Sequence, residues 1–131
     1  VMVIFSLLLL AGCTDSKIER NTKLESDFKS LISMVSDKSD SKININPFVD
    51  FEWDKAFLIS PYTSQEEIEK KIGVSFNDPS NIYSRDDIYL LIFLHNEKIV
   101  QYAEINRQQS NISLGEVEYL TPSNDFVFVI R

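Results

Sequence analysis

The sequence contains very little cysteine, histidine and glycine: one Cys, one His and three Gly among 131 residues. A single Cys excludes a disulfide within the chain, and one Cys with one His is too few for a zinc site of the usual composition. Three glycines provide little material for a phosphate-binding loop, and no P-loop, dinucleotide fingerprint or G-x-S-x-G motif occurs. We therefore expect no metal site and no cofactor.

Basic residues are also few relative to acidic ones. The chain has 13 Lys and Arg and 20 Asp and Glu, which gives a net charge of -7. Residues 1–12 carry no charged side chain, so the whole excess lies on the later part of the chain. An acidic domain is repelled by phosphate backbones and by anionic lipid headgroups. Nucleic acid is therefore not an expected partner, and attachment to a membrane would need something other than a basic patch.

Long hydrophobic runs are limited to residues 1–11, which are apolar except for Ser6. This length fits the apolar region of a secretory signal peptide and is shorter than the roughly 20 residues that span a bilayer. The run ends in Leu10, Ala11, Gly12 and Cys13. An aliphatic residue, two small residues and a Cys resemble the lipobox of bacterial lipoprotein signal peptides.

The resemblance implies that a peptidase cuts between Gly12 and Cys13, that the Cys13 thiol carries a diacylglyceryl group, and that the new amino terminus is acylated. Two or more acyl chains give stable anchoring, so the implied partner is a membrane and the implied location is the extracytoplasmic side of a cell membrane or outer membrane. The chain begins with Val1, and no Lys or Arg precedes the run. We therefore expect the natural start upstream or at an alternative start codon. The alternative interpretation is an amino-terminal hydrophobic helix with a buried Cys.

These features predict three regions: a signal peptide over residues 1–12, a lipidated Cys and polar tether over 13–23, and one domain over 24–131. Within the domain, apolar residues at helical spacing predict a helix over 24–35, and a capping-box pattern followed by Gly73 predicts a second helix over 65–72. Alternating or continuous apolar runs predict strands over 55–59, 88–94, 98–106, 116–120 and 126–130. The expected fold is α+β, with an antiparallel sheet of about four to five strands and two helices packed on one face.

Candidate catalytic groups are few. His95 could serve a Ser-His pair, but it lies in a predicted hairpin turn, where an exposed histidine is the simpler interpretation. Paired carboxylates of a glycosidase-like site would have to come from acidic residues near the ends of predicted elements. The candidates are Asp50, Glu52, Asp54, Asp78, Asp86 and Asp87. None has the spacing of a calcium-binding loop, and we interpret them as solubilising charges.

Five aromatic residues gather within a short segment, namely Phe48, Phe51, Trp53, Phe57 and Tyr62. They either belong to the core or form a docking surface. Trp53 and Tyr62 are amphipathic side chains of the type favoured at binding hot spots, and they lie near segment ends. These two residues are therefore the candidate interaction surface.

The body of the chain is similar to small bacterial lipoproteins and membrane-associated proteins of unknown function. The matching positions are Trp53, Asp54, Pro61, Tyr62, Thr63 and Gly73. This resemblance implies neither an activity nor catalytic residues. We expect a lipid-anchored cell-envelope protein that acts as a non-catalytic binding or accessory module, with another envelope protein as its candidate partner. The alternatives are an envelope hydrolase using paired carboxylates and an inhibitor or immunity protein whose acidic surface meets a basic enzyme.

Overall fold

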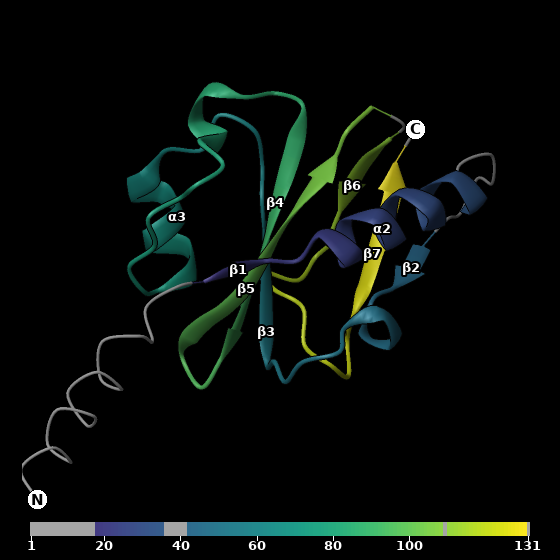
Figure 1. The fold of residues 1–131 in the computed structure, drawn as a ribbon, viewed down its shortest axis with the longest axis horizontal. Helices are drawn as coiled ribbons and strands as arrows, with labels where there is room; N and C mark the ends of the chain where they lie inside the picture. The colour runs from purple at the N-terminus through teal and green to yellow at the C-terminus, as the bar shows by residue number, and fades with distance from the viewer. Residues whose placement is uncertain (1–17, 36–41, 109, 131) are drawn as a thin grey trace, which may run out of the picture.

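The computed structural model describes residues 18–35, 42–108 and 110–130, and Figure 1 shows their arrangement. In chain order the elements are β1 (Glu19–Arg20), α2 (Thr22–Val35), β2 (Lys42–Asn44), the 3-10 turn η1 (Asn46–Phe48), β3 (Lys55–Ile59), α3 (Gln65–Ile72), the 3-10 turn η2 (Ile82–Ser84), β4 (Ile88–His95), β5 (Lys98–Asn106), β6 (Asn111–Ser113) and β7 (Phe126–Ile130). No helix in these ranges is long and apolar enough to cross a bilayer.

The strands form two sheets. The larger sheet has the order β1-β5-β4-β3, and the smaller sheet has the order β2-β7-β6. β1 runs parallel to β5, whereas the other neighbouring strands are antiparallel. β4 and β5 are joined at Asn96 and Glu97, which both have positive φ, as the commonest two-residue hairpin turn requires. This short connection accounts for the antiparallel pairing of β4 with β5.

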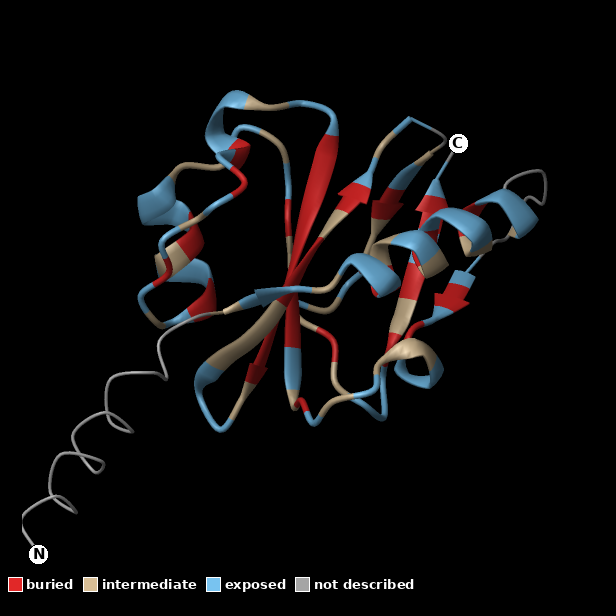
Figure 2. Cartoon of the chain, viewed as in Figure 1, coloured by how far each residue is buried: buried red, intermediate tan, exposed pale blue. Residues whose placement is uncertain are grey.

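The central strand β4 is apolar on both sides. Its residues 88–94 are all buried, and Figure 2 shows it as a largely red strand. Leu91 and Phe93 enter one apolar cluster, while Leu90 and Ile92 enter another. Because both faces of this strand carry apolar side chains, other elements must pack against both faces of the larger sheet.

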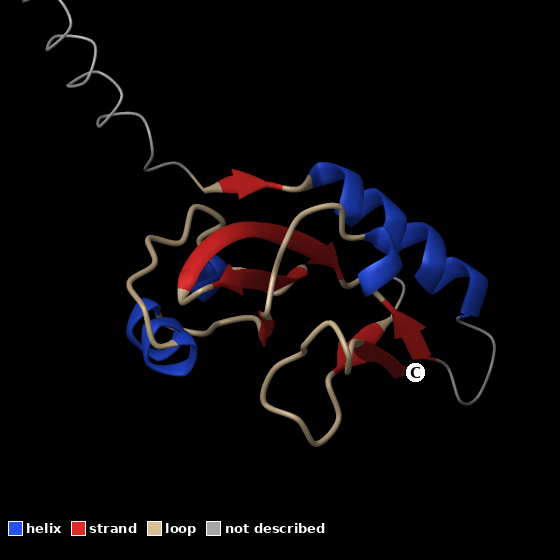
Figure 3. Cartoon of the chain, turned by 90° about the horizontal axis from the view of Figure 1, so that it is seen from below, coloured by secondary structure: helices blue, strands red, loops and turns tan. Residues whose placement is uncertain are grey.

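One face of the larger sheet packs against α2 and the smaller sheet together. Leu24, Phe28 and Ile32 project from α2 at helical spacing and are each 1% exposed. Ile43 of β2 and Val127 of β7 belong to the same cluster. In Figure 3, α2 and the smaller sheet lie toward one end of the molecule and α3 lies toward the other. This cluster is the larger of the two cores.

The opposite face packs against α3 and the segment that follows it. Ile68 and Ile72 of α3 are buried together with Phe76 and Ile82 of the connection to β4. Ile18, the first described residue, packs against this cluster as well. The second core therefore joins the beginning of the described chain to the middle of the domain.

The α+β class predicted from the sequence is confirmed. Two details of the expected architecture differ: the strands are divided between two sheets, and the two helices cover opposite faces of the larger sheet instead of one. The physical reason lies in β4, since a strand with two apolar faces requires a cover on each side.

The helix α3 has the bounds that its sequence pattern predicts. The Ser64 hydroxyl accepts the Glu67 N–H at 3.2 Å, and the Glu67 carboxylate accepts the Ser64 N–H at 3.1 Å, which completes a capping box. Gly73 ends the helix in the left-handed region at φ 84°, where its N–H bonds the Glu69 carbonyl. The predicted strands over 55–59, 98–106 and 126–130 are confirmed with the same bounds.

Four segments differ from expectation. Residues 116–120 were expected to be a strand but contain only an isolated bridge between Leu120 and Ala56. β2 and β6 occupy segments expected to be loops, and each has a single buried side chain, Ile43 or Ile112. β1 and the first two residues of α2 lie within the expected tether, and Ile18 of the same segment packs against the second core.

Candidate binding site

Trp53, one of the two residues of the predicted interaction surface, lies in the core. It is 6% exposed and packs edge-on against Phe93, with 5.3 Å between ring centroids. Phe51 contacts the same ring in a similar geometry at 5.1 Å. Trp53 therefore stabilises the fold and is not accessible for docking, because its ring is enclosed by its neighbours.

Tyr62, the other predicted residue, is exposed. The residue is 59% exposed, and its backbone has a φ of 67°. The Tyr62 N–H donates a hydrogen bond of 2.9 Å to the carbonyl of Ile82, which directly precedes Tyr83. Tyr83 is itself 62% exposed. The fold thus brings together the chain segments of two exposed tyrosines, and the sequence predicted only the first of them, Tyr62, as a site residue.

A groove of about 350 Å³ lies at the beginning of α3, and Tyr83 is one of its lining residues. We call it the tyrosine groove, and its lining residues are Thr63, Ser64, Gln65, Glu66, Asp78, Asn81 and Tyr83. Most of these side chains are uncharged hydroxyls and amides. The size falls within the range of small-ligand sites, and a few polar groups beside aromatic rings are typical of such sites.

The walls of the tyrosine groove are held by internal hydrogen bonds. Asp78 accepts the N–H and hydroxyl of Ser80 at 2.8 and 2.6 Å and the N–H of Ile82 at 2.9 Å. Gln65 accepts the Asp78 N–H at 3.3 Å and donates to Glu69 at 2.9 Å. The loop that carries Tyr83 is therefore fixed to α3 before any ligand arrives, which lowers the entropy cost of binding.

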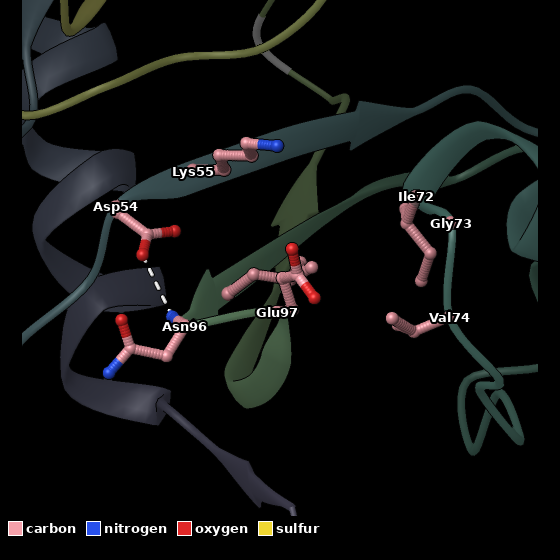
Figure 4. Close-up of a pocket in the computed structure, with 8 residues that line it drawn as sticks. Asp54, Lys55, Ile72, Gly73, Val74, Asn96 and Glu97 are labelled. Atoms are coloured by element: carbon pink, nitrogen blue, oxygen red, sulfur yellow. Dashed lines mark hydrogen bonds between the residues drawn. The ribbon is translucent and has the colours of Figure 1, made fainter.

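A second cavity, of about 500 Å³, lies between the β4–β5 turn and the end of α3. Its lining residues are Asp54, Lys55, Ile72, Gly73, Val74, Leu94, Asn96 and Glu97. Figure 4 shows Asp54 and Asn96 on one side of it, joined by a hydrogen bond in which the Asn96 N–H donates to Asp54 Oδ2 at 2.8 Å. Asp54 and Glu97 are thus two carboxylates that line this cavity, and Asp54 also holds the turn through its hydrogen bond to Asn96.

His95 lies among carboxylates. Its Nε2 is 3.4 Å from Glu52 Oε1, and its Nδ1 is 3.7 Å from Asp54 Oδ2, beyond hydrogen-bond distance. Nδ1 is buried and has no hydrogen-bond partner among the described residues. The ring therefore faces two acids, which is not the hydroxyl contact that a Ser-His pair requires.

The remaining acidic candidates are not gathered at one site. Asp50 and Asp86 are exposed, Asp78 braces the tyrosine groove, and Asp87 binds Arg85. Arg85 Nε and Nη2 donate to the two Asp87 oxygens at 2.9 and 2.8 Å. These hydrogen bonds hold the pKa of Asp87 below its ordinary value and the pKa of Arg85 above its own. Asp87 is therefore a structural anion.

A charge network at the sheet edge was not expected from the sequence. Glu104 lies between Arg20 at 3.4 Å and Arg85 at 3.3 Å, and Arg20 also binds Glu25 at 2.7 Å. The hydrogen bond from Arg20 to Glu25 raises the pKa of Arg20, and burial raises the pKa of Tyr102 beside them. Because Glu25 also accepts the Glu104 N–H at 2.9 Å, the network joins α2 to the edge of β5.

Gly12 and Cys13, the predicted cleavage and lipidation positions, lie outside the described residues. Within residues 18–35, 42–108 and 110–130 there is no group of three or more His, Cys, Asp or Glu side chains placed to hold a metal ion. No family model, curated protein or solved structure matches the chain.

Proposed function

We propose that this chain is a lipid-anchored protein of the bacterial cell envelope whose α+β domain is a non-catalytic binding or accessory module. The observation that carries the proposal is the lipobox-like sequence Leu10 to Cys13 directly ahead of the domain. Ile18 already packs against the second core. Four residues lie between Cys13 and Ile18, so the Cα atoms of these two residues are no more than about 18 Å apart even when the chain is fully extended. A lipid on Cys13 would therefore hold the domain at the membrane surface, on the extracytoplasmic side of a cell membrane or outer membrane.

The binding role is supported by the tyrosine groove. Tyr83 exposes a large amphipathic ring at a polar groove whose walls are held by internal hydrogen bonds. Tyrosine is enriched among residues that dominate binding energy, and braced walls reduce the cost of association. We therefore assign the groove, and not Trp53, as the binding surface of the domain.

A hydrolase is the second candidate, because Asp54 and Glu97 line the same cavity. Acid–base catalysis by a carboxyl group at neutral pH needs an apolar setting that raises its pKa. The Asp54 side chain is 45% exposed and one of its oxygens is occupied by the turn. These contacts favour a structural role for Asp54. An assay for oligosaccharide cleavage by the wild type and by Asp54→Asn separates the binding module from the hydrolase, because only a hydrolase would cleave the sugar and lose that activity in Asp54→Asn.

The anchor is tested by mass spectrometry of the amino-terminal peptide of the natural protein. We expect a peptide that begins at Cys13 and carries a thioether-linked diacylglyceryl group. Cys13→Ser should move the protein out of the membrane fraction or leave it unprocessed, whereas the neighbouring change Thr14→Ala should do neither. A natural peptide that begins upstream and holds Cys13 as a free thiol would refute the proposed location.

A further inference from the structure

The imidazole of His95 has an unsatisfied nitrogen that faces a carboxylate. Nδ1 is the one buried side-chain nitrogen or oxygen of the described residues that has no hydrogen-bond partner. Asp54 Oδ2 lies 3.7 Å from Nδ1, and Glu52 Oε1 lies 3.4 Å from Nε2. A neutral ring has one N–H and can donate to only one of these two acceptors. A protonated ring has two N–H donors, so it matches both carboxylates.

Charged residues approach the His95 ring from two sides. Glu52 and Asp54 come from the segment that leads into β3, and both are within ion-pair distance of the ring. On the other side, Lys98 is directly opposite His95 in the strand register, and Glu97 lies in the turn between them. A cationic ring therefore has two carboxylate partners before β3 and one cationic neighbour across the hairpin. The ring can bind the acids only while it is protonated and they are ionised.

The same carboxylate oxygen connects the ring to the β4–β5 turn. Asp54 Oδ2, which faces Nδ1, also accepts the Asn96 N–H at 2.8 Å, as Figure 4 shows. Asp54, Asn96 and Glu97 together line the cavity of about 500 Å³. A movement of about 0.5 Å would bring both ring nitrogens within hydrogen-bond distance of their carboxylates. A change of charge on His95 therefore acts on the residues that form one wall of this cavity.

We propose that His95 is a pH-sensitive switch, in which protonation binds the ring to Asp54 and Glu52 and tightens the β4–β5 turn beside the cavity. Histidine ordinarily becomes a cation below about pH 6.5, and carboxylates are ordinarily ionised above about pH 4. The ion pairs therefore form at mildly acidic pH, and they are lost as the pH rises through the histidine range. This inference depends neither on the lipid anchor nor on a ligand of the tyrosine groove.

The test compares thermal unfolding of the full chain at pH 5.5 and pH 7.5. The chain has a single histidine, so His95→Gln removes the only imidazole that titrates in this interval. The difference between the wild-type midpoint and that of His95→Gln should be about 2 to 4 °C more favourable to the wild type at pH 5.5, as expected for partly exposed ion pairs. Glu52→Gln should reduce this shift, whereas Glu66→Gln, an exposed acid of α3, should not.

A second measurement reports on the turn itself. Backbone ¹⁵N relaxation should show that the amides of Asn96 and Glu97 are more rigid at pH 5.5 than at pH 7.5 in the wild type and equally rigid at both pH values in His95→Gln. The proposal is overturned if the midpoints of the two chains respond equally to pH or if acidification favours His95→Gln. It is also overturned if the wild-type turn amides do not change, because the ring would then not act on the cavity wall.

Discussion

The indole Nε1 of Trp53 donates a hydrogen bond of 2.9 Å to Oδ1 of Asn46. The bond joins the 3-10 turn η1 to a ring that is otherwise enclosed by apolar side chains. A buried indole N–H without a hydrogen-bond partner destabilises the folded state, because it has lost its hydrogen bond to water. Asn46 therefore allows the only tryptophan of the chain to lie in the core.

The first prediction concerns this pair. Asn46→Ala leaves the Trp53 N–H unsatisfied and should lower the free energy of unfolding by about 1 to 3 kcal/mol, measured by urea denaturation at pH 7. In a Trp53→Phe background the donor is absent, so the same change should cost much less. If Asn46→Ala lowers the free energy of unfolding equally in the wild type and in Trp53→Phe, the hydrogen bond from Trp53 Nε1 to Asn46 adds no stability.

The sequence predicts the elements that carry strong local signals. The capping box at Ser64 and the left-handed residue Gly73 define α3, and the continuous apolar run of β4 identifies the central strand. Such signals come from residues close together in the chain, so tertiary context does not alter them. The helix α2 follows likewise from its apolar stripe.

The short strands β2 and β6 could not be predicted in this way. Each has three residues with one buried side chain, Ile43 or Ile112, between polar neighbours. Three residues are too few to establish a period of two. They are strands because β7 lies between them and pairs with both. The segment around Leu120 shows the opposite outcome, because it was predicted to be a strand and forms only an isolated bridge. Leu120 exchanges two backbone hydrogen bonds with Ala56, and the pairing does not extend to its neighbours.

The candidate site was predicted only in part for the same reason. Tyr62 and Tyr83 are distant in the chain, and their segments meet through tertiary hydrogen bonds, such as the backbone bond from Tyr62 to Ile82. Trp53 was a candidate because of its residue type, and the structure places it against Phe93 instead. Residue type identifies which side chains favour binding, but exposure depends on packing partners that are distant in sequence.

The second prediction concerns acid stability. The hydrogen bonds from Arg85 hold the pKa of Asp87 below its ordinary value of 3.8. A lowered pKa in the folded state contributes stability above the unfolded value, and this contribution is lost as the pH falls through the folded value. Asp87→Asn should therefore cost less than about 1 kcal/mol at pH 7, because the Asp87 side chain is 53% exposed.

The free energies of unfolding of the wild type and of Asp87→Asn should then become closer below about pH 4, because the wild type loses the contribution of the ionised Asp87 carboxylate. Urea midpoints at pH 7, 5 and 3 measure the difference. Asp86→Asn, at the exposed neighbouring position, is the control and should show no such pH dependence. A difference between Asp87→Asn and wild type that grows on acidification would contradict the assigned role of Arg85.

The third prediction concerns the cap of α3. Ser64→Ala removes the acceptor for the Glu67 N–H and should lower the free energy of unfolding by about 1 kcal/mol. Ser75→Ala, at an exposed position after the helix, should change it by less than about 0.5 kcal/mol. Thermal unfolding of both variants checks the difference, and equal midpoints would mean that the capping box adds no stability.

The fourth prediction compares two glycines that both have positive φ. Gly73 has a φ of 84° and open space around the position of a Cβ, whereas Gly115 has a φ of 73° and a Cβ there would lie 3.0 Å from Phe128 Cε2. Gly73→Ala should therefore cost about 1 kcal/mol from backbone conformation alone. Gly115→Ala should cost more, because the Phe128 ring must also move.

The source of this extra cost can be isolated, because Phe128 is 37% exposed and its truncation leaves the core intact. In a Phe128→Ala background, Gly115→Ala should cost about as much as Gly73→Ala does in the wild type, as measured by urea denaturation. If the cost at Gly115 stays the same after the ring is removed, the contact with Phe128 is not its cause. The fold would then require glycine at this position for its backbone conformation alone, as it does at Gly73.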